Sequence, residues 1–445
     1  MVGKRGLFDE KRRVPAPAQD EEGERSITVW LRSRPAAGAA SCVSKDSAGR
    51  ARVRVPMASD ASSSSPHEQQ RALAFDFDRV LGQDVVQEDV FGSGVPAFLG
   101  RAFSGRDVLI STYGQTSSGK TYTMIGDSDS GEDAGILPRA VRHCFDRAAE
   151  AESALEVHVE MVEIYNEELR DLLRSCKADH GAPPPRKLAI RSDPRFGTSI
   201  DGLERAREPG PSQALSRIRA ALERRATAET GMNRSSSRSH VLCFLLLTDR
   251  ATGKLVSKIG LADLAGSERQ GKTGATGRTL KEGGSINRSL SALERVVNDI
   301  QSYRKQRAPA GASCARGPPG VGFPDSKLTR ILQPFLTGRG TSVFVLCVSP
   351  RQQDAGETLN TMKFGQRLQG ISQAVVVLEA PASAEANHEP WAAASYPLAM
   401  AASAPGGSRG ASGLAKSFAR ELAWCLGAIV LRSLLLRAIV AAPWV

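Results

Sequence analysis

The sequence predicts a three-layer α/β domain in which helices flank a central, mostly parallel sheet. Three observations carry this prediction. Short apolar runs that suit strands alternate with helical patterns up to about residue 373. A glycine-rich loop of the phosphate-binding type directly follows one of these runs, and an aspartate ends another of them.

The expected strands are of two kinds. Ile27–Leu31 is a short β-rich run, and Val157–Ile164 alternates apolar and polar residues as a half-buried strand does. The other runs are continuously apolar, which suits strands buried on both faces. They are Leu109–Ser111, Val241–Leu247, Ile259–Leu264 and Val343–Val348.

Helical patterns lie between the strands, and the clearest covers Ile286–Ile300. Its apolar residues Ile286, Leu290, Leu293, Val297 and Ile300 share one helix face. Two stretches interrupt the alternation and are expected to be surface loops. They are the serine-rich Ser59–Ser65 and the long, Arg-, Pro- and Gly-rich Tyr303–Gly322.

Composition divides the chain into four parts. Residues 1–25 mix charges with prolines and are expected to be a disordered lead-in. Residues 26–373 form the α/β domain. Residues 374–413 continue from a strand-like segment into an Ala/Ser/Pro-rich linker, and residues 414–445 are predicted to form an apolar helix of unknown role.

The uncharged stretch within the apolar C-terminal segment is too short to cross a bilayer. Leu422–Leu431 has ten uncharged residues, and Arg432 and Arg437 follow it, which would be costly near mid-span. We favour a helix that packs on the domain or on a partner. An interfacial helix or tail anchor, or an atypical C-terminus, is the alternative.

Charge and cysteine usage narrow the class of protein. The chain has 59 Lys and Arg against 48 Asp and Glu, a formal net charge of +11. This excess favours an acidic partner such as nucleic acid, an anionic membrane or an acidic protein surface, unless it serves only solubility. The seven cysteines include no C-x-x-C pair, so we expect a reducing compartment without a zinc site. The N-terminus lacks the apolar core of a signal peptide.

The glycine-rich loop, Gly114-Gln-Thr-Ser-Ser-Gly-Lys120-Thr121, fits the pattern G-x-x-x-x-G-K-[ST]. Glycines let successive backbone N–H groups approach a phosphate closely. Lys120 would reach the β- and γ-phosphates, and the Thr121 hydroxyl would ligate Mg²⁺. A Gly/Ser-rich turn of chance composition is the alternative, and two downstream motifs argue against it.

Those two motifs are Asn233-Arg-Ser-Ser-Ser-Arg-Ser-His240 and Asp263-Leu-Ala-Gly266-Ser-Glu268. Asp263 ends an apolar strand, as expected for an acid of the Mg²⁺ shell, and a glycine at 266 frees a backbone N–H for the γ-phosphate. Arg238 and Glu268 are predicted to form an ion-pair latch. We interpret His240 as a structural or positioning residue and not a metal ligand. A strand–turn with an Asp cap, and a polar or phosphorylated serine-rich loop, are the alternatives.

In this order the three motifs resemble those of a kinesin motor domain, and the resemblance covers about residues 26–373. Asn233–His240 fits the family's switch I pattern N-x-x-S-S-R-S-H, and Asp263–Glu268 fits switch II, D-L-A-G-S-E. Further segments match in family order. They are Arg32–Pro35, Phe75–Asp78, Tyr122–Met124, Glu163–Glu168, Lys281–Glu282, Ile286–Leu290, Asp325–Arg330 and Glu357–Leu359.

The resemblance implies a P-loop NTPase fold with an eight-stranded, mostly parallel sheet, and ATP and Mg²⁺ as ligands. It implies that Arg32 and Pro35 border the adenine and that Tyr122 stacks on it. The remaining nucleotide contacts fall on Gly114, Gln115, Thr116, Ser117, Ser118, Gly119, Lys120, Thr121, Asn233, Ser236 and Asp263. Mg²⁺ is assigned to Thr121 and Ser237, with Asp263 acting through water. The catalytic group is Ser237, Arg238, Gly266 and Glu268.

The resemblance also implies a microtubule-binding face on Lys272–Gly284, Ile286–Ile300 and Tyr303–Leu336. Arg304–Arg339 has seven Lys and Arg against one acid, Asp325, which would steer an acidic filament onto this face. A solvated loop with incidental charge is the alternative. The contact residues implied are Lys272, Arg288, Arg304, Lys305, Arg307, Lys327 and Arg330.

Several positions depart from the family pattern. The loop before Asp325 is enlarged and holds Pro309, Pro318 and Pro319, and Pro324 replaces a basic residue, so altered microtubule affinity is expected. Gly283 and Gly365 stand where alanine is usual and would weaken local helix. No heptad run long enough for a coiled coil occurs.

We therefore expect a microtubule-stimulated ATPase motor of the cytoplasm and its microtubule cytoskeleton. Ile371–Leu378 resembles a neck linker after the motor, which favours plus-end-directed movement. A nucleotide-binding but non-motile microtubule protein is the alternative. No nucleic-acid partner is expected because no RNA- or DNA-binding motif occurs. The oligomeric state is not predicted.

Overall fold

The structure is a computed structural model of the 445-residue chain. It describes residues 26–36, 41–56, 70–150, 153–174, 187–193, 197–230, 238–268, 278–306, 321–337 and 340–371, all within the unit Met1–Ala384. Several predicted segments lie outside these residues. They are the lead-in 1–25, Ser59–Ser65, residues 372–378 of the neck-linker-like segment, the linker to residue 413 and the apolar segment 414–445.

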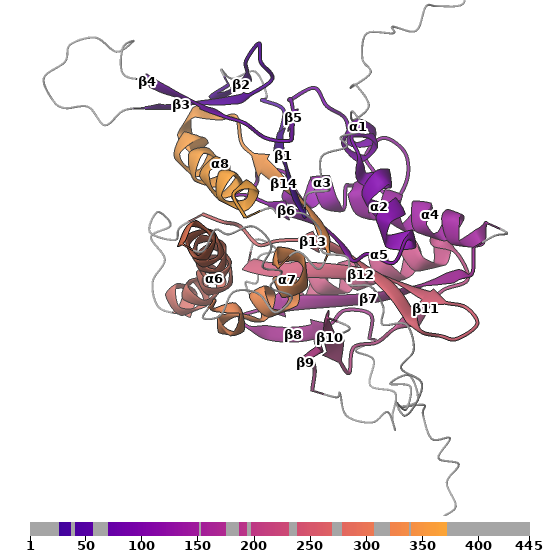
Figure 1. Cartoon of the computed structure of the whole chain (residues 1–445). Helices are drawn as coiled ribbons and strands as arrows, with labels where there is room; N and C mark the ends of the chain where they lie inside the picture. The colour runs from indigo at the N-terminus through magenta and orange to yellow at the C-terminus, as the bar shows by residue number, and fades with distance from the viewer. Residues whose placement is uncertain are drawn as a thin grey trace, which may run out of the picture. The chain divides into compact units, whose positions relative to one another are not determined.

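Nine strands form one sheet through the middle of the domain (Figure 1). Eight of them follow the order β11-β7-β12-β13-β6-β14-β1-β5, and β8 pairs with β7 beside this path. Their bounds are β1 Ile27–Ser33, β5 Arg79–Leu81, β6 Val108–Tyr113, β7 Leu155–Tyr165, β8 Glu168–Asp171, β11 Ala206–Arg207, β12 Ser239–Asp249, β13 Leu255–Asp263 and β14 Thr341–Val348.

The sheet has a parallel half and an antiparallel half. The strands β13, β6, β14, β1 and β5 pair in parallel, whereas β11, β7, β8, β12 and β13 pair antiparallel. The connection from β12 to β13 is too short for the crossover that a parallel pair needs. The predicted three-layer fold is confirmed, and its sheet is more mixed than the sequence indicated.

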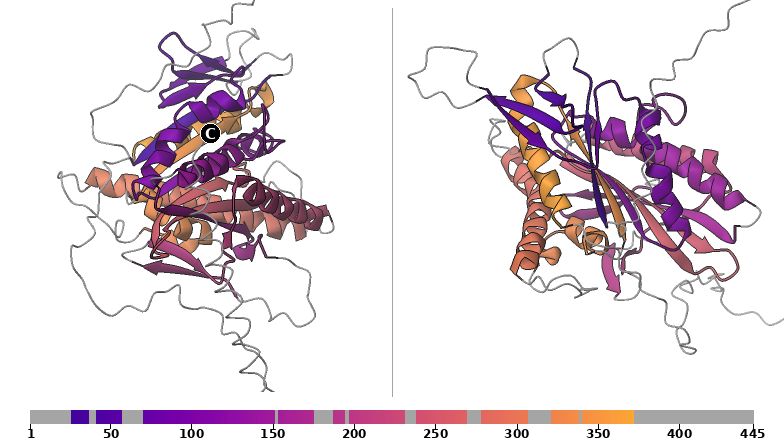
Figure 2. Two further views of the ribbon diagram at one scale, coloured as in Figure 1. Left: turned by 90° about the vertical axis from the view of Figure 1, so that its right-hand side faces the viewer. Right: turned by 45° about the horizontal axis from the view of Figure 1, so that its top comes forward.

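Helices form the outer two layers (Figure 1; Figure 2). α6, α7 and α8 pack on one face of the sheet, and α1 to α5 on the other. Their bounds are α1 Gln87–Gly92, α2 Val95–Phe103, α3 Lys120–Met124, α4 Ile136–Ala149, α5 Pro211–Thr230, α6 Arg278–Gln306, α7 Lys327–Leu336 and α8 Ala355–Gln369.

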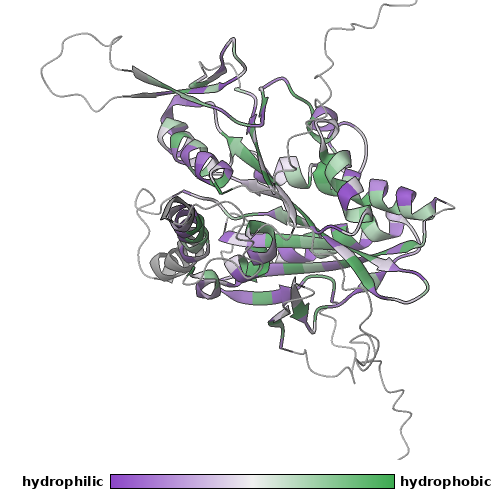
Figure 3. Ribbon diagram, viewed as in Figure 1, coloured by the Kyte–Doolittle hydropathy of each residue, from purple (hydrophilic) through white to green (hydrophobic). Residues whose placement is uncertain are grey.

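Alternate residues of the central strands enter two separate cores. In β14, Val343 and Val345 join the core under α1 to α5, while Phe344 and Leu346 join the core under α6, α7 and α8. Figure 3 accordingly shows hydrophobic residues concentrated along the inner strands. The four continuously apolar runs of the sequence are therefore confirmed as strands buried on both faces.

The prediction of a half-buried strand at Val157–Ile164 is wrong. Every residue of β7 from Val159 onward is buried. Its polar positions Glu160 and Glu163 pair with Arg205 and Arg225, each at 2.9 Å, instead of facing water. The alternation along β7 thus reflects paired buried carboxylates, which a polarity pattern does not distinguish from exposed ones.

The predicted helix at Ile286–Ile300 is confirmed and is longer on both sides, as α6 covers Arg278–Gln306. Leu290, Leu293, Val297 and Ile300 are all buried on its inner face. The predicted loop therefore begins later than Tyr303, because residues 303–306 complete the last turn of the helix. Residues 307–320 lie outside the described part.

Two small sheets complete the described domain. The strands β2 Val43–Lys45, β3 Ala51–Pro56 and β4 Gln70–Phe75 form an antiparallel sheet against α8. The hairpin of β9 Ala189–Asp193 and β10 Gly197–Asp201 lies beside α7. Among the described helices, none has the length and apolarity that a membrane crossing requires.

Candidate functional site

The phosphate loop connects the C-terminal end of β6 to the N-terminus of α3. Two of its glycines have backbone conformations that side chains rarely adopt, with φ of 149° at Gly114 and 98° at Gly119. A Cβ on Gly114 would overlap the carbonyl oxygen of Cys347 in the neighbouring strand β14. The loop is thus pressed against the sheet, with its course set by glycine.

Lys120, the first residue of α3, is only 7% exposed. Its Nζ donates a hydrogen bond to the Gln115 carbonyl oxygen at 2.8 Å, which folds the side chain back over the loop. Burial lowers the pKa of Lys120, while the negative charges of Asp263 and Glu268 act in the opposite direction. The ammonium group is therefore buried in the loop, and two carboxylates from the segment at the end of β13 partly offset its desolvation.

Asp263 and Thr121 meet beside this lysine. Asp263 ends β13 as predicted, and the parallel register places it opposite Thr112 of β6. The Thr121 hydroxyl donates to Asp263 Oδ2 at 2.6 Å, and the Thr112 hydroxyl donates to Oδ1 at 3.0 Å. Two of the three oxygen-bearing residues predicted for Mg²⁺ are therefore adjacent, and oxygens are the ligands that this ion prefers.

The segment after β13 folds directly over the phosphate loop. Ser267 N–H donates to the Gly114 carbonyl at 3.0 Å. The Glu268 carboxylate accepts from the Thr116 N–H at 2.7 Å and from the Thr116 hydroxyl. A Cβ on Gly266 would overlap Thr116 Oγ1 and the Glu268 carboxylate. The two motifs, far apart in sequence, therefore share one interface, in which a side chain at position 266 would displace Thr116 and Glu268.

The residues predicted to border a base lie at the other end of the loop. Tyr122 is 37% exposed, Pro35 is exposed, and the Arg32 guanidinium lies 5.6 Å from the Tyr122 ring centre. Arg32 itself is buried, because it donates to Gln87 Oε1 at 2.6 Å and Thr123 Oγ1 at 2.8 Å. Arg32 therefore lies against the partly exposed Tyr122 ring and is held in place from its other end.

Sequence reasoning missed several residues that hold the site. Gln87 and Thr123 orient Arg32, Thr112 orients Asp263, and Arg34 donates to the Ser117 carbonyl at 2.6 Å. Arg34 lies inside Arg32–Pro35, one of the segments that match the family pattern, so the sequence did point to it. Thr123 likewise lies inside the matching segment Tyr122–Met124, whereas for Gln87 and Thr112 no local pattern exists, because their partners are distant in the chain.

The serine-rich motif is only partly described. Asn233, Ser236 and Ser237 lie outside the described residues, and Arg238 is the first residue after that gap. The predicted latch between Arg238 and Glu268 stays a prediction. In this structure the Glu268 carboxylate is bonded to Thr116 of the phosphate loop.

Buried polar atoms test whether these residues fit a nucleotide. Within the part of the chain that the structure describes, Ser118 Oγ and Gln115 Oε1 are buried without a hydrogen-bond partner. Leaving such groups unpaired costs about 1–3 kcal/mol each. A phosphate oxygen could accept from the Ser118 hydroxyl and from Lys120, and a hydrated cation could donate to Gln115. The donor set therefore fits a triphosphate with its metal ion.

The predicted basic residues fall on two neighbouring helices. Arg288 is exposed on α6, while Lys327 and Arg330 lie half-buried on α7. α6 and α7 contact each other on the same face of the sheet (Figure 1). Arg304 and Lys305 belong to the last turn of α6, and nothing is described of their side chains. Lys272 and Arg307 lie outside the described residues.

α7 is anchored by a residue from a distant hairpin. Glu167, in the turn between β7 and β8, accepts from the Ser326 hydroxyl and from the Lys327 N–H, each at 2.7 Å. Arg330 donates to the Ile190 carbonyl of β9 at 3.1 Å. The first turn of α7 is therefore capped by a carboxylate, which favours its free N–H groups.

A phosphate loop between a buried strand and a helix, facing a strand-end aspartate, defines a P-loop nucleotide-binding protein. The family model for the kinesin motor domain matches residues 27–371. The chain belongs to the kinesin family.

Curated relatives and solved structures agree with this assignment. The chain is 37% identical over 308 residues to Kinesin-like protein 3 of Schizosaccharomyces pombe, covering 68% of this chain and 52% of that protein. It is 36% identical over 303 residues to a kinesin heavy chain of Syncephalastrum racemosum, covering 67% of this chain and 30% of that protein. The chain thus matches about half or less of the length of these relatives.

Two solved kinesin structures are similar to the chain. A fast kinesin has a TM-score of 0.66 at 31% identity, covering 79% of this chain and 93% of that one. A KIF14 dimer in its two-heads-bound state, with AMP-PNP and in complex with a microtubule, has a TM-score of 0.64 at 28% identity. It covers 80% of this chain and 96% of that one.

Proposed function

We propose that this chain is a microtubule-stimulated ATPase that converts the hydrolysis of Mg·ATP into plus-end-directed movement. The observation that carries the proposal is the convergence of Lys120, Thr121, Asp263 and Glu268 on one phosphate loop. Family membership supports ATP as the nucleotide and the microtubule as the filament.

Each group at the site has a role that its geometry supports. The N–H groups of the phosphate loop and the Lys120 ammonium would bind the phosphates, and Thr121 with Ser237 would hold the ion, with Asp263 acting through water. Mg²⁺, when bound, neutralises charge on the β- and γ-phosphate oxygens. The Gly266 N–H senses the γ-phosphate, because the glycine leaves room for its close approach. Arg238 and Glu268 close around the last phosphate, which requires Glu268 to leave Thr116.

The filament side is proposed to be α6 with α7. Arg288, Lys327 and Arg330 lie on these helices, together with Arg304 and Lys305 at the end of α6. A basic surface attracts an acidic polymer. Salt screens this attraction beyond the Debye length, which is about 8 Å at physiological ionic strength. Binding to microtubules should therefore weaken steeply as salt rises.

ATPase activity of the full chain, with and without microtubules, tests the proposal. Wild-type turnover should rise with microtubule concentration, and Lys120→Ala should lower it by at least about a hundredfold because a preorganised positive charge is removed. Lys254→Ala, an exposed lysine in the turn between β12 and β13, is the matched control and should behave as wild type. Absence of stimulation in a wild-type chain that hydrolyses ATP would overturn the motor assignment.

A non-motile microtubule protein is the second candidate, and one feature favours it. The chain before α7 is enlarged relative to the family and contains Pro324 within the short 3-10 turn Phe323–Asp325, directly before the helix. Gliding of polarity-marked microtubules over the immobilised chain separates the two candidates. Gliding with the minus end leading supports plus-end movement, whereas nucleotide-dependent binding without gliding supports the non-motile function.

A further inference from the structure

His240 joins three elements that meet beside the nucleotide site. It is the second residue of β12 and its side chain is 2% exposed. Its Nδ1 lies 3.0 Å from the backbone nitrogen of Ala265, in the segment after β13. Its Nε2 lies 2.8 Å from the hydroxyl of Ser289, on α6. One imidazole ring therefore connects β12, the segment that carries Gly266, and α6.

The partners of the ring determine its tautomer. The backbone N–H of Ala265 can only donate, so Nδ1 must be the unprotonated acceptor. Nε2 then carries the hydrogen and donates it to the Ser289 hydroxyl. Burial, with smaller contributions from Lys120 and Arg225, lowers the pKa of His240 to about 3. The ring is thus neutral at physiological pH, and both of its nitrogens are used.

The Ala265 bond restrains the residue that precedes Gly266. Leu264 N–H donates to the Thr112 carbonyl at 3.4 Å, and Ser267 N–H donates to the Gly114 carbonyl at 3.0 Å. Ala265 N–H, bonded to His240, lies between these two contacts with the β6 strand and the phosphate loop. The peptide that presents the Gly266 N–H is therefore held from both sides of the segment.

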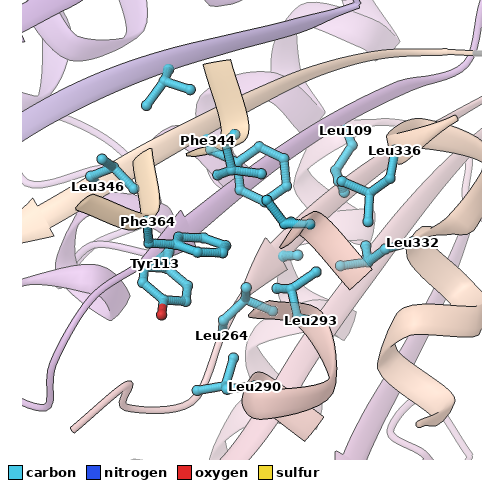
Figure 4. Close-up of a cluster of buried hydrophobic side chains, with 14 of the residues drawn as sticks. Leu109, Tyr113, Leu264, Leu290, Leu293, Leu332, Leu336, Phe344, Leu346 and Phe364 are labelled. Atoms are coloured by element: carbon cyan, nitrogen blue, oxygen red, sulfur yellow. The ribbon is translucent and has the colours of Figure 1, made fainter. Parts of the chain in front are cut away.

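The Ser289 bond leads to the proposed filament face. Ser289 is buried, and its neighbour Arg288 is exposed on the same helix. Figure 4 shows Leu290 and Leu293 of α6 in the same buried cluster as Leu264, the residue before Ala265. Apolar packing therefore runs alongside the hydrogen-bonded bridge, so a shift of α6 is felt by the segment after β13.

We propose that His240 is a positioning residue that couples the γ-phosphate-sensing segment at Ala265–Gly266 to α6, through Nδ1 on one side and Nε2 on the other. This inference rests on the proposed function for the identity of the two ends. The two ring nitrogens have different roles. The Nδ1 bond to Ala265 determines how the segment responds to the γ-phosphate, and the Nε2 bond to Ser289 transmits that movement to α6.

Two half-variants separate the two hydrogen bonds. His240→Asn keeps an amide oxygen near the Nδ1 position, which can accept from Ala265, and loses the reach to Ser289. His240→Gln keeps a donor near the Nε2 position and loses the acceptor for Ala265. Ser289→Ala removes the second bond from the helix side. His158→Gln is the matched control. His158 lies on β7, the strand beside β12, and its ring bonds Glu156 at 2.9 Å.

The first measurements need no filament. The full-length chains are compared for affinity to a non-hydrolysable ATP analogue and to ADP, and for hydrogen exchange at the Ala265 amide. His240→Gln should lose about tenfold of the preference for the ATP analogue and exchange Ala265 faster, with ADP affinity retained. His240→Asn and Ser289→Ala should keep both properties.

Microtubule stimulation then tests the other half. His240→Asn and Ser289→Ala should lose about tenfold of the microtubule-stimulated kcat, with little change in KM for ATP. His158→Gln should match wild type in every measurement. The proposal is overturned if His240→Asn and His240→Gln lose nucleotide preference and stimulated kcat to the same extent. It is also overturned if every variant stays within about twofold of wild type in both properties.

The outcomes remain separable from those of the proposed function. A wild-type chain without microtubule stimulation overturns the motor function, while nucleotide preference and Ala265 exchange still decide the Nδ1 half. If neither His240 variant unfolds cooperatively, Ser289→Ala decides: reduced stimulation supports the coupling, and unchanged stimulation overturns it.

Discussion

The nucleotide end of the domain and the α6–α7 side are built by different means. At the nucleotide end the backbone itself is the binding surface, and Gly114 and Gly266 lie where a single added carbon would collide with neighbouring atoms. At the α6–α7 side, buried leucines hold the helices, and the basic side chains proposed to contact the filament lie exposed or half-buried on them. The first region should tolerate almost no change in shape, whereas the second should respond to charge and to capping in small steps.

The largest expected effect is at Gly266. Gly266→Ala should lower the rate of ATP hydrolysis by at least about a hundredfold, because the new Cβ would displace Thr116 and Glu268 and misplace the N–H group. Single-turnover hydrolysis measures this. The control is Gly356→Ala on α8, where an added Cβ meets nothing within 4 Å. Near wild-type hydrolysis in Gly266→Ala would show that the nucleotide end is not shape-limited.

The next effect concerns the metal ion. Asp263→Asn should weaken the apparent affinity for Mg²⁺ by about 10- to 100-fold, because it removes the charge that orients the Thr121 hydroxyl. The Mg²⁺ concentration for half-maximal ATPase measures it. Asp249→Asn, at a half-buried aspartate that ends β12 and accepts from Thr252 in the turn that follows, should leave the Mg²⁺ dependence unchanged. If both variants behave alike, Asp263 is not part of the ion site.

A third prediction follows from the buried histidine. The folded-state pKa of His240 is lowered to about 3, below an unfolded value near 6.5. Unfolding therefore takes up a proton between these values, so this residue costs no stability above about pH 6.5. Below it the free energy of unfolding should fall by about 1.4 kcal/mol per pH unit. Between pH 7.5 and 5.5 the loss in free energy of unfolding, measured with urea, should be smaller in His240→Asn by about 1.4 kcal/mol in total. Equal losses in the two proteins would mean that folding does not lower the pKa of His240.

The smallest effect lies on the α6–α7 side. Glu167→Gln should lower the free energy of unfolding by about 1 kcal/mol, because a neutral amide caps the first turn of α7 less well. It should also weaken microtubule binding a little while leaving ATP affinity intact. Equilibrium unfolding and pelleting measure these effects. Glu168→Gln, the exposed neighbour, is the control, and a loss of ATP affinity in Glu167→Gln would contradict the separation of the two regions.

These two regions also differ in how far the sequence predicts them. The phosphate loop is contiguous, so Gly114–Thr121 could be recognised together with its strand and its helix. The end of β13 at Asp263 followed from a single apolar run. By contrast, Glu167 adds a second acceptor to the N-terminus of α7 beyond its local cap Ser326, and the support of Arg32 comes from Gln87 and Thr123. No local pattern encodes partners so far apart in the chain.

Gly365 shows, within one helix, the limit of predicting a residue's role from its helix propensity. From sequence it is a weak point of α8, since glycine lowers helix propensity by about 1 kcal/mol relative to alanine. In the folded chain an added Cβ would overlap Leu346 of β14 and the Phe77 ring. The residue therefore permits close packing of α8 on the sheet, and propensity alone gives the wrong sign for its role.

The sequence by itself determined the fold class, the phosphate loop, the strand-end aspartate and the family, because each is carried by short contiguous patterns of apolar and glycine residues. Only the tertiary structure decided the mixed character of the sheet, the buried carboxylates of β7, the contact of Glu268 with Thr116, and the bridge through His240. Those features depend on which strands and helices become neighbours. Hydrogen bonds and ion pairs between them form only once burial has brought distant residues together.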